Sequence, residues 1–313
     1  MRYVLGRVGQ AAVVLLAAFT LSFVLLHALP GDALLVKFEN PELGLSAAEI
    51  ASLRAAYGAD VPVLQQYLAA IGSFVTGDLG YSVQYGTPVA TLLVEALPGT
   101  LALAVTGFVV AVVLAVGIAA LSSLAPFAWV RGALRAAPSL FAAVPVFWLA
   151  IVLVQVFSFR LGLVPVIAAS PVQALILPVV ALAVPISAPL AQVLVRSIDD
   201  VRLQPFVTVA AAKGASQRWL LARTVARNAL LPTLTIAGVL LGELIGGAVV
   251  TETVFGRAGV GRLTEQAVST QDIPVLQGVV VLAALTFVVV NLVVDLLYPV
   301  LDPRTRTRTG ARA

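Results

Sequence analysis

The sequence predicts an all-α polytopic membrane protein with six transmembrane helices. Of its 313 residues, 60% are hydrophobic and only 11% are charged, whereas a soluble domain carries about 25% charged residues. A helix needs about 20 mainly apolar residues to cross a bilayer. Six stretches meet this requirement, and they cover roughly residues 9–29, 98–121, 136–158, 173–196, 230–251 and 276–300.

The first apolar stretch, 9–29, follows Arg2 and Arg7, as the apolar part of a secretory signal would. However, it is longer than the apolar part of a typical signal, and Leu29-Pro30-Gly31-Asp32 is a poor cleavage site. We therefore expect an uncleaved first span. At its outer end we expect His27 to have a structural role at the membrane interface.

The basic residues predict the orientation of the chain. If both termini lie in the cytoplasm, fourteen of the 19 lysines and arginines fall in cytoplasmic segments and five fall outside. Cytoplasmic loops of membrane proteins carry such an excess of basic residues. The external residues would be Lys37, Arg54, Arg160, Arg257 and Arg262.

The external segment 30–97 is long and much less apolar than its flanks. Ser46 and Glu49 have the spacing of a capping box, which predicts a short helix from Ser46 to Gly58. A second helix is expected over 62–75, followed by a turn at Gly77-Asp78-Leu79-Gly80-Tyr81-Ser82. We therefore divide the chain into an N-terminal span (1–29), a small extracytoplasmic subdomain (30–97), a core bundle of five spans (98–302) and a basic cytoplasmic tail (303–313).

Several prolines and glycines lie within the spans. Prolines kink helices, which suits a moving pathway, but proline is also common in membrane helices in general. Both interpretations stay open for Pro138, Pro145, Pro178, Pro185 and Pro189. In the fifth span, glycines four residues apart allow close approach of another helix, of this chain or of another. These packing glycines are Gly238, Gly242 and Gly246.

The sequence excludes most enzymatic chemistry. There is no cysteine, there is one histidine, and the lysines are Lys37 and Lys213, so no phosphate-binding loop with its lysine is present. No Ser/His/Asp set is available either. We expect no catalytic residue, no metal site, no cofactor and no nucleic-acid partner, and the chain cannot hydrolyse ATP by that route.

Two acidic residues fall within the apolar stretches. Glu243 lies in the middle of the fifth span, where a charged side chain is costly unless it faces a bundle interior or water. It could line a translocation pathway and meet a substrate amine, or it could serve packing as a neutral or hydrogen-bonded group. Asp295 is expected to contact basic residues near the cytoplasmic end of the last span. Asn291, one turn earlier, could line the pathway or bond another helix.

The loop 199–228 is the most informative part of the chain. Its simplest interpretation is a solvated basic loop. However, Ala210, Ala211 and Ala212 would make a thin helix face able to enter a groove, and Gly214 would end that helix. Arg218, Trp219, Leu220, Arg223 and Arg227 would then form a second amphipathic helix that runs back to the fifth span. A helix-turn-helix of this kind fits docking into a groove on another protein.

This loop resembles the EAA loop of ABC importer permeases, in the form found in the dipeptide/oligopeptide/nickel family. Ala210-Ala211-Ala212-Lys213-Gly214 is similar to that family's Ala-Arg-Ala-Lys-Gly core, and Arg227-Asn228-Ala229-Leu230-Leu231-Pro232 is similar to its end. Further similar motifs follow in order along nearly the whole chain. They include Leu29-Pro30-Gly31-Asp32, Leu97-Pro98-Gly99-Thr100-Leu101, Gly259-Val260-Gly261-Arg262-Leu263 and Leu301-Asp302-Pro303-Arg304.

The chain departs from the family pattern at two positions. Thr208 replaces the glutamate that gives the loop its name, and Ala211 replaces the usual arginine of the core. These changes leave open which side chains contact a partner. They do not alter the role that the resemblance implies for the loop.

The resemblance implies a B-type permease subunit in the bacterial inner membrane, with the type I ABC importer permease fold. It implies a second homologous permease, one or two cytoplasmic ATPases, an extracytoplasmic binding protein and a peptide substrate, with membrane lipid around the bundle. Cytoplasmic ATPases would drive alternating access through the loop. The implied coupling residues are Thr208, Ala210, Ala211, Ala212, Lys213, Gly214 and Ala215. Nickel, glutathione, haem or another small solute is the alternative cargo, and a secondary transporter the alternative class.

Overall fold

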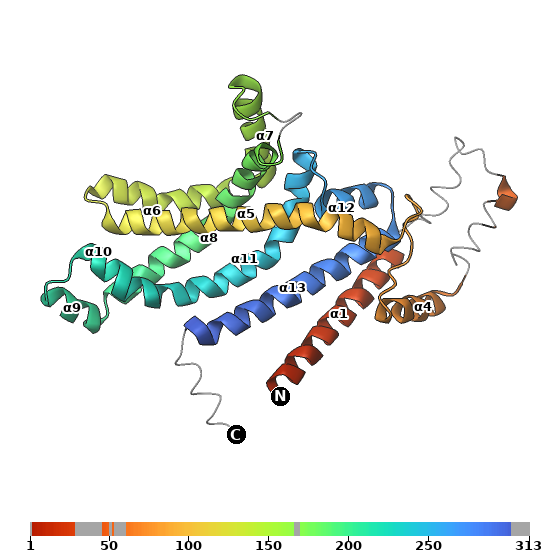
Figure 1. The fold of residues 1–313 in the computed structure, drawn as a ribbon, viewed down its shortest axis with the longest axis horizontal. Helices are drawn as coiled ribbons and strands as arrows, with labels where there is room; N and C mark the ends of the chain where they lie inside the picture. Colours follow the sequence, from red (N-terminus) through yellow and green to blue (C-terminus); the bar gives the residue numbers. More distant parts are fainter. Residues whose placement is uncertain (1, 29–45, 50–51, 53–60, 166–169, 302–313) are drawn as a thin grey trace. The chain divides into compact units, whose positions relative to one another are not determined.

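The computed structural model describes residues 2–28, 46–49, 52, 61–165 and 170–301 (Figure 1). Within these ranges the regular structure is helical, apart from one isolated bridge between Tyr81 and Pro88. The expected all-α class is therefore confirmed. The chain forms two compact units, Met1–Gly99 with Ala258–Val288 (unit 1) and Thr100–Arg257 with Val289–Ala313 (unit 2).

The expected spans correspond to helices that are long and apolar enough to cross a membrane. In the described residues there are five such helices, or six if one bent pair counts as a single span. The unbroken helices belong to α1 (Arg2–Ala28), α5 (Val89–Leu124), α8 (Gln173–Arg202), α11 (Ala226–Val254) and α13 (Ile273–Leu301). Helix α5 begins nine residues before the expected start of the second span at 98, because Pro98 is accommodated inside it.

The third expected span, 136–158, is not one straight helix. Helix α6 (Ala128–Ala143) and the helix formed by α7 (Val146–Leu153) and η2 (Val154–Arg160) are bent by 100° at the break. Val144 there is extended, with φ −88° and ψ 116°, and Pro145 precedes the first residue of α7. A residue before proline is disfavoured in the helical region, so the helix ends at this point. Pro138, in contrast, lies buried within α6.

In unit 1, α1 packs against α4 (Val63–Val75) through aromatic rings. Phe19 stacks on Phe74 at a centroid distance of 4.8 Å, and Phe23 meets the edge of Tyr67 at 5.3 Å. The Tyr67 and Thr20 hydroxyls share a hydrogen bond of 2.8 Å. Helix α4 confirms the helix expected over 62–75, and positive φ angles of 83° at Gly77 and 75° at Gly80 confirm the turn that follows.

A second part of unit 1 joins the start of α5 to α12 (Val260–Ser269) and α13. Their buried side chains form one cluster, which includes Val89, Leu93, Leu263 and Val275. Gly278 of α13 allows this packing, since a Cβ there would lie 2.6 Å from the Val89 side chain.

The buried carboxylate of Asp272 fastens the segment before α5 to the α12–α13 turn. The Ser82 hydroxyl donates to Asp272 Oδ2 at 2.5 Å, and the backbone amides of Gln84 and Val83 donate to its two oxygens at 3.0 and 3.3 Å. Asp272 is 1% exposed. With the Val275 amide, which donates to Oδ1 at 3.5 Å, four donors compensate for burial of the carboxylate, which would otherwise be costly.

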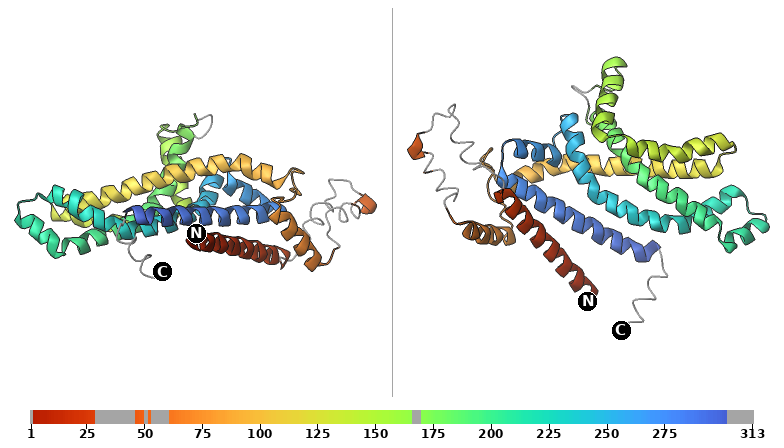
Figure 2. Two further views of the ribbon diagram at one scale, coloured as in Figure 1. Left: turned by 60° about the horizontal axis from the view of Figure 1, so that its bottom comes forward. Right: turned by 180° about the vertical axis from the view of Figure 1, so that it is seen from behind.

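Unit 2 is organised around α8, which packs against α11, α6 and α7 (Figure 2). Leu182 of α8 is 1% exposed and lies between two glycines. A Cβ on Gly107 of α5 or Gly247 of α11 would come within 3.0 or 3.1 Å of the Leu182 side chain. The helices therefore approach closely where these glycines lie. The Thr100 hydroxyl also donates to buried Glu252 at 2.7 Å, which links α5 to the end of α11.

Parts of the sequence prediction lie outside the described residues. They are the turn at 29–32, most of the helix expected over 46–58, and the tail 303–313. The side chains of His27 and Asp295 also lie outside them. Of the capping box, Ser46 and Glu49 are described and confirm the expectation. The Ser46 amide and hydroxyl donate to Glu49 Oε2 at 2.8 and 2.7 Å, and the Glu49 amide donates back to Ser46 Oγ at 3.3 Å.

Candidate functional site

The candidate site is a hairpin between α8 and α11, at one end of the helices of unit 2 (Figure 1). Helix α8 ends at Arg202, and Gln204 is extended, with φ −72° and ψ 142°. Pro205 begins α9 (Pro205–Ala212). Proline suits this position because it forces the preceding residue out of the helix and needs no helical donor itself.

The tip of the hairpin is closed by a glycine turn. Gly214 has a φ of 89°. The amide of Ala215 donates to the carbonyl of Ala210 at 3.3 Å, and the amide of Gly214 donates to the carbonyl of Ala211 at 2.9 Å. This pair of bonds is the Schellman motif, in which a left-handed residue, usually glycine, ends a helix. The predicted helix break at Gly214 is confirmed.

The second arm starts at Ser216, whose hydroxyl accepts from the amide of Trp219 at 3.3 Å. Helix α10 (Gln217–Trp219) continues through a π-helical stretch, η3 (Leu220–Val225), into α11. The expected second helix is thus present, and it runs without a break into the helix of the fifth span. Pro232 is accommodated within α11.

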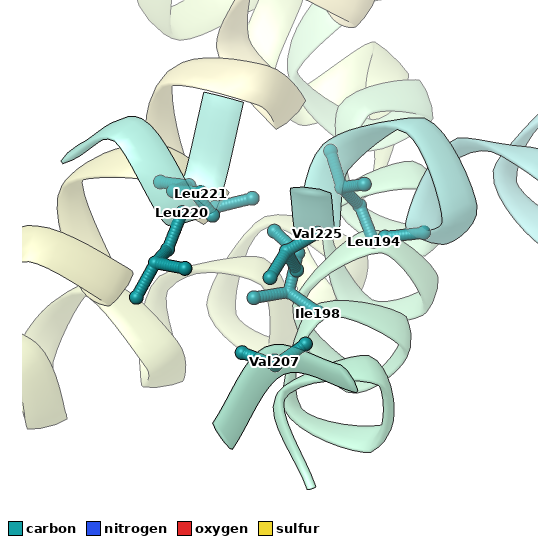
Figure 3. Close-up of a cluster of buried hydrophobic side chains, with 8 residues drawn as sticks. Leu194, Ile198, Val207, Leu220, Leu221 and Val225 are labelled. Atoms are coloured by element: carbon teal, nitrogen blue, oxygen red, sulfur yellow. The ribbon is translucent and has the colours of Figure 1, made fainter. Parts of the chain in front are cut away.

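Buried apolar side chains hold the hairpin on unit 2 (Figure 3). Val207 of α9 is 6% exposed, and it shares a cluster with Leu194 and Ile198 of α8 and with Leu220 and Val225 of η3. Ala210 and Ala215, on either side of the turn, pack against the same cluster. The hairpin is therefore fixed on the α8–α11 pair, so that a force on it is transmitted to these helices.

Polar contacts brace the base of the hairpin. Arg135 of α6 forms an ion pair of 2.8 Å with Asp199 of α8. Arg202 donates a hydrogen bond of 3.3 Å to the carbonyl of Ser123 at the end of α5. The end of α8 is thus tied to two neighbouring helices, although a half-exposed ion pair such as Arg135–Asp199 adds little stability by itself.

The outer side of the hairpin is exposed, and it carries most of the residues that the sequence singled out. Ala210 and Ala215 are half-buried at the turn, and the other residues are exposed, namely Thr208, Ala211, Ala212, Lys213 and Gly214. The two departures from the family pattern, Thr208 and Ala211, thus both lie on the exposed side. The structure brings these residues together on one short helix and its turn.

The same surface combines cations with exposed apolar side chains. Lys213, Arg218 and Arg223 are exposed, and Phe206, Val209 and Trp219 are 46%, 55% and 51% exposed. An apolar surface rimmed by charge is typical of a protein-binding surface. The sequence did not indicate that Val207 is buried while Phe206 and Val209 are exposed. The alternation of apolar residues in Phe206-Val207-Thr208-Val209 does not reveal which of them is buried.

The other predicted site residues lie elsewhere in unit 2. Glu243 of α11 is exposed, and Asn291 of α13 is half-buried. The glycines of α11 differ from one another, because Gly238 is buried, Gly242 is half-buried and Gly246 is exposed. A Cβ on Gly246 would meet nothing within 4 Å. Within this chain it is therefore Gly247, rather than Gly246, that meets a neighbouring helix.

Among the residues that the structure describes, no group of three or more His, Cys, Asp or Glu side chains could hold a metal ion. The fold and the hairpin together define a polytopic membrane protein with an exposed basic surface between two of its membrane helices. The chain belongs to the family described as binding-protein-dependent transport system inner membrane component, which matches residues 112–307. The family is a transport permease family rather than an ATPase family.

Comparison with known proteins places the chain among permeases of peptide and glutathione transport systems. It is 33% identical over 306 residues to a glutathione transport system permease protein, GsiC, of Escherichia coli, covering 98% of this chain and 99% of GsiC. It is also 33% identical over 313 residues to the oligopeptide transport system permease protein AppB of Bacillus subtilis, covering 96% and 98% of the two chains.

Solved structures show the same fold. An inward-facing structure of the MetNI methionine ABC transporter matches with a TM-score of 0.58 and 17% identity, over 67% of this chain and 96% of that one. An amino acid ABC transporter crystallised with histidines matches with a TM-score of 0.54 and 16% identity, over 67% of this chain and 94% of that one. The fold is therefore that of an ABC transporter permease, as predicted.

Proposed function

We propose that this chain is the permease subunit of an ATP-driven importer and forms half of a translocation pathway for peptides. The α9–η3 hairpin carries the proposal, because it is exposed at its tip and rigidly packed at its base. A partner that pulls on Lys213 and Gly214 would move α8 and α11 through Val207 and Val225, and so switch the pathway between its two states.

The proposal includes the partners that supply energy and cargo. One or two cytoplasmic ATPases bind the hairpins, a second homologous permease completes the pathway, and an extracytoplasmic binding protein delivers the substrate. This arrangement requires both termini and the hairpin in the cytoplasm. The excess of basic residues in these segments supports that orientation.

Peptides are the favoured cargo, because AppB and other relatives of similar identity are named as oligopeptide or peptide permeases. Glutathione, itself a small peptide, is the second candidate, because GsiC is named as a glutathione permease and matches equally well. Both cargoes carry a free amino group and carboxylates, so they pose similar demands on a pathway.

Purification of the complex through a tag on this chain tests the proposal. We expect an ATPase, a second permease and a binding protein to co-purify, and the complex in proteoliposomes to take up trialanine or glutathione when ATP is supplied. Lys213→Glu should abolish retention of the ATPase, whereas Lys213→Arg, which keeps the charge, should preserve it. Recovery of this chain with no ATPase, or full retention in Lys213→Glu, would contradict the proposed role of the hairpin.

A further inference from the structure

Helix α11 carries an exposed carboxylate close to its midpoint. Glu243 lies three residues from the centre of the 29-residue helix Ala226–Val254, which is about 4.5 Å along its axis. Its side chain is exposed, and in the part of the chain that the structure describes it has no hydrogen-bond or ion-pair partner. One turn further on, Gly246 leaves the same side of the helix open.

Lipid cannot be the normal environment of this side chain. A carboxylate at the centre of a membrane helix is costly in lipid, and such residues face protein or water. The question is therefore what shares the exposed side of α11 with Glu243.

At this level α11 packs on α8, among other helices, and α8 and α11 run in opposite directions. Leu182 meets Gly247, Leu190 shares a cluster with Leu240, and Leu194 shares one with Val225 and Ala229. Rising numbers on α8 thus pair with falling numbers on α11. Interpolation between these pairs places Glu243 level with about residue 186 of α8.

The exposed side of α8 carries two prolines near this level and polar side chains further toward the hairpin. Pro185 and Pro189 are half-buried, while Gln192 and Arg196 are exposed. These residues are spaced by three or four positions, so they lie on one face. Because Pro189 has no N–H, the carbonyl of Pro185 has no helical donor and can accept a hydrogen bond from elsewhere.

Helix geometry brings the two faces to the same side of the pair. On α8 the four residues are rotated by roughly 60–120° from the side that packs on α11, and on α11 Glu243 is rotated by roughly 40–60° from Leu240 and Gly247, which pack on α8. Both rotations are opposite in sense to the winding of the helix as residue numbers rise. In an antiparallel pair, rotations of the same sense about each helix's own axis turn the side chains toward the same side of the pair.

We infer that Pro185, Gln192 and Glu243 form a cation-accepting face on the α8–α11 pair, which receives the ammonium group of the cargo during passage. The inference rests on the proposed importer function. An ammonium group has three N–H donors. The Glu243 carboxylate and the Pro185 carbonyl offer acceptors at one level, and the Gln192 amide lies about 9 Å nearer the hairpin. Glu243 thus determines specificity for cargo with a free amino group.

The chain contains no cysteine, so Pro185→Cys introduces a single thiol on this face, level with Glu243 and about 16 Å along the axis from the cation of Arg196. In membranes that contain the whole complex, its rate of modification is measured with two impermeant methanethiosulfonates, one carrying trimethylammonium and one carrying sulfonate. Both right-side-out and inside-out vesicles are used. We expect the cationic reagent to react faster by about tenfold, the lower end of the enrichment that a charged cleft produces.

The same ratio is then measured after Glu243→Gln, with Glu243→Asp as the matched control that keeps the charge. We expect the preference to disappear in Glu243→Gln, to persist in Glu243→Asp, and to fall with rising salt when Glu243 is intact. The salt series tests the inference even if Glu243→Gln does not assemble.

Two results would overturn the inference. If neither reagent modifies Pro185→Cys from either side, the face is covered by protein or lipid. If the thiol reacts with no preference for the cation, or with a preference that Glu243→Gln and salt leave unchanged, Glu243 does not act on this face. Neither result would affect the importer role, because retention of the ATPase is scored separately in the same preparations.

Discussion

The amide of Ala215 donates to the carbonyl of Ala210 across Gly214, at 3.3 Å, and both alanines pack on the cluster that holds the hairpin to α8. The turn is therefore part of the hydrophobic core of unit 2 on its inner side, while Lys213 and Gly214 remain exposed on its outer side. In the proposed function, a partner that binds the tip would move the helices behind it.

Replacing Gly214 with valine should uncouple the hairpin. Its φ of 89° costs a side-chain-bearing residue about 1–2 kcal/mol, and a β-branched residue more. We expect Gly214→Val to abolish cargo-stimulated ATP hydrolysis in the purified complex, with normal membrane insertion.

Gly132→Val is the matched control. Gly132 is exposed on α6, and a Cβ there meets nothing within 4 Å. Gly132→Val should leave cargo-stimulated ATP hydrolysis within about twofold of the wild type, since substitutions at exposed helix positions away from special features change stability little. Equal activity of the two variants would show that the conformation at Gly214 is unimportant.

Val207→Ala should loosen the hairpin without altering its exposed surface. Val207 is 6% exposed, whereas Val209, two residues on, is 55% exposed. Removing two buried carbons should cost about 1.5–3 kcal/mol. We expect amide hydrogen exchange over 205–225 to accelerate by at least about tenfold in Val207→Ala and to stay near the wild-type rate in Val209→Ala. The reverse order would contradict the packing of α9.

Asp272→Asn should destabilise unit 1. The carboxylate accepts from Ser82, Val83 and Gln84 while almost fully buried, and an amide cannot accept from all three. We expect a loss of about 2–4 kcal/mol, seen as a lower midpoint of thermal unfolding in detergent. Asp78→Asn, at an exposed position that accepts from Gly80 alone, should change the midpoint little. Equal midpoints for the two variants would be evidence against the Asp272 network.

The capping box in the external segment predicts a pH dependence. Hydrogen bonds from the Ser46 hydroxyl, and then from its amide, lower the pKa of Glu49. A lowered pKa means that the box stabilises its helix above the unfolded pKa and that this contribution is lost as the pH falls through the folded pKa. We expect Ser46→Ala to raise the pKa of Glu49 toward its ordinary value, as followed by the carboxyl ¹³C shift in nanodiscs. Ser52→Ala, which removes a hydroxyl bonded to the Glu49 carbonyl rather than to its side chain, should not.

Local sequence signals predicted much of the hairpin and of the external segment. Gly214 ends α9 because glycine alone adopts its conformation freely, and the Ser46–Glu49 spacing specifies a capping box by itself. The apolar stretches likewise predicted where the membrane helices lie. Each of these signals acts over a few residues, which is why it can be recognised in the sequence.

Relations between distant residues could not be predicted in this way. Ser82 and Asp272 are 190 positions apart, and neither neighbourhood indicates the other. The sequence left open whether the prolines kink the spans, and it does not distinguish Pro138 from Pro145, although the 100° bend between α6 and α7 lies at Pro145. The burial of Val207 and the exposure of Glu243 depend on how α8 and α11 pack.

The most direct test of the central claim is to find what touches the tip of the hairpin in the assembled complex. A photoreactive p-benzoylphenylalanine at Ala212, which is exposed beside Lys213, is irradiated in native membranes, and the cross-linked product is identified by mass spectrometry. We predict a cross-link to a cytoplasmic ATPase subunit, absent when the same residue replaces exposed Trp129 of α6. A cross-link to a protein of the opposite side of the membrane, or to no protein at all, would contradict the account.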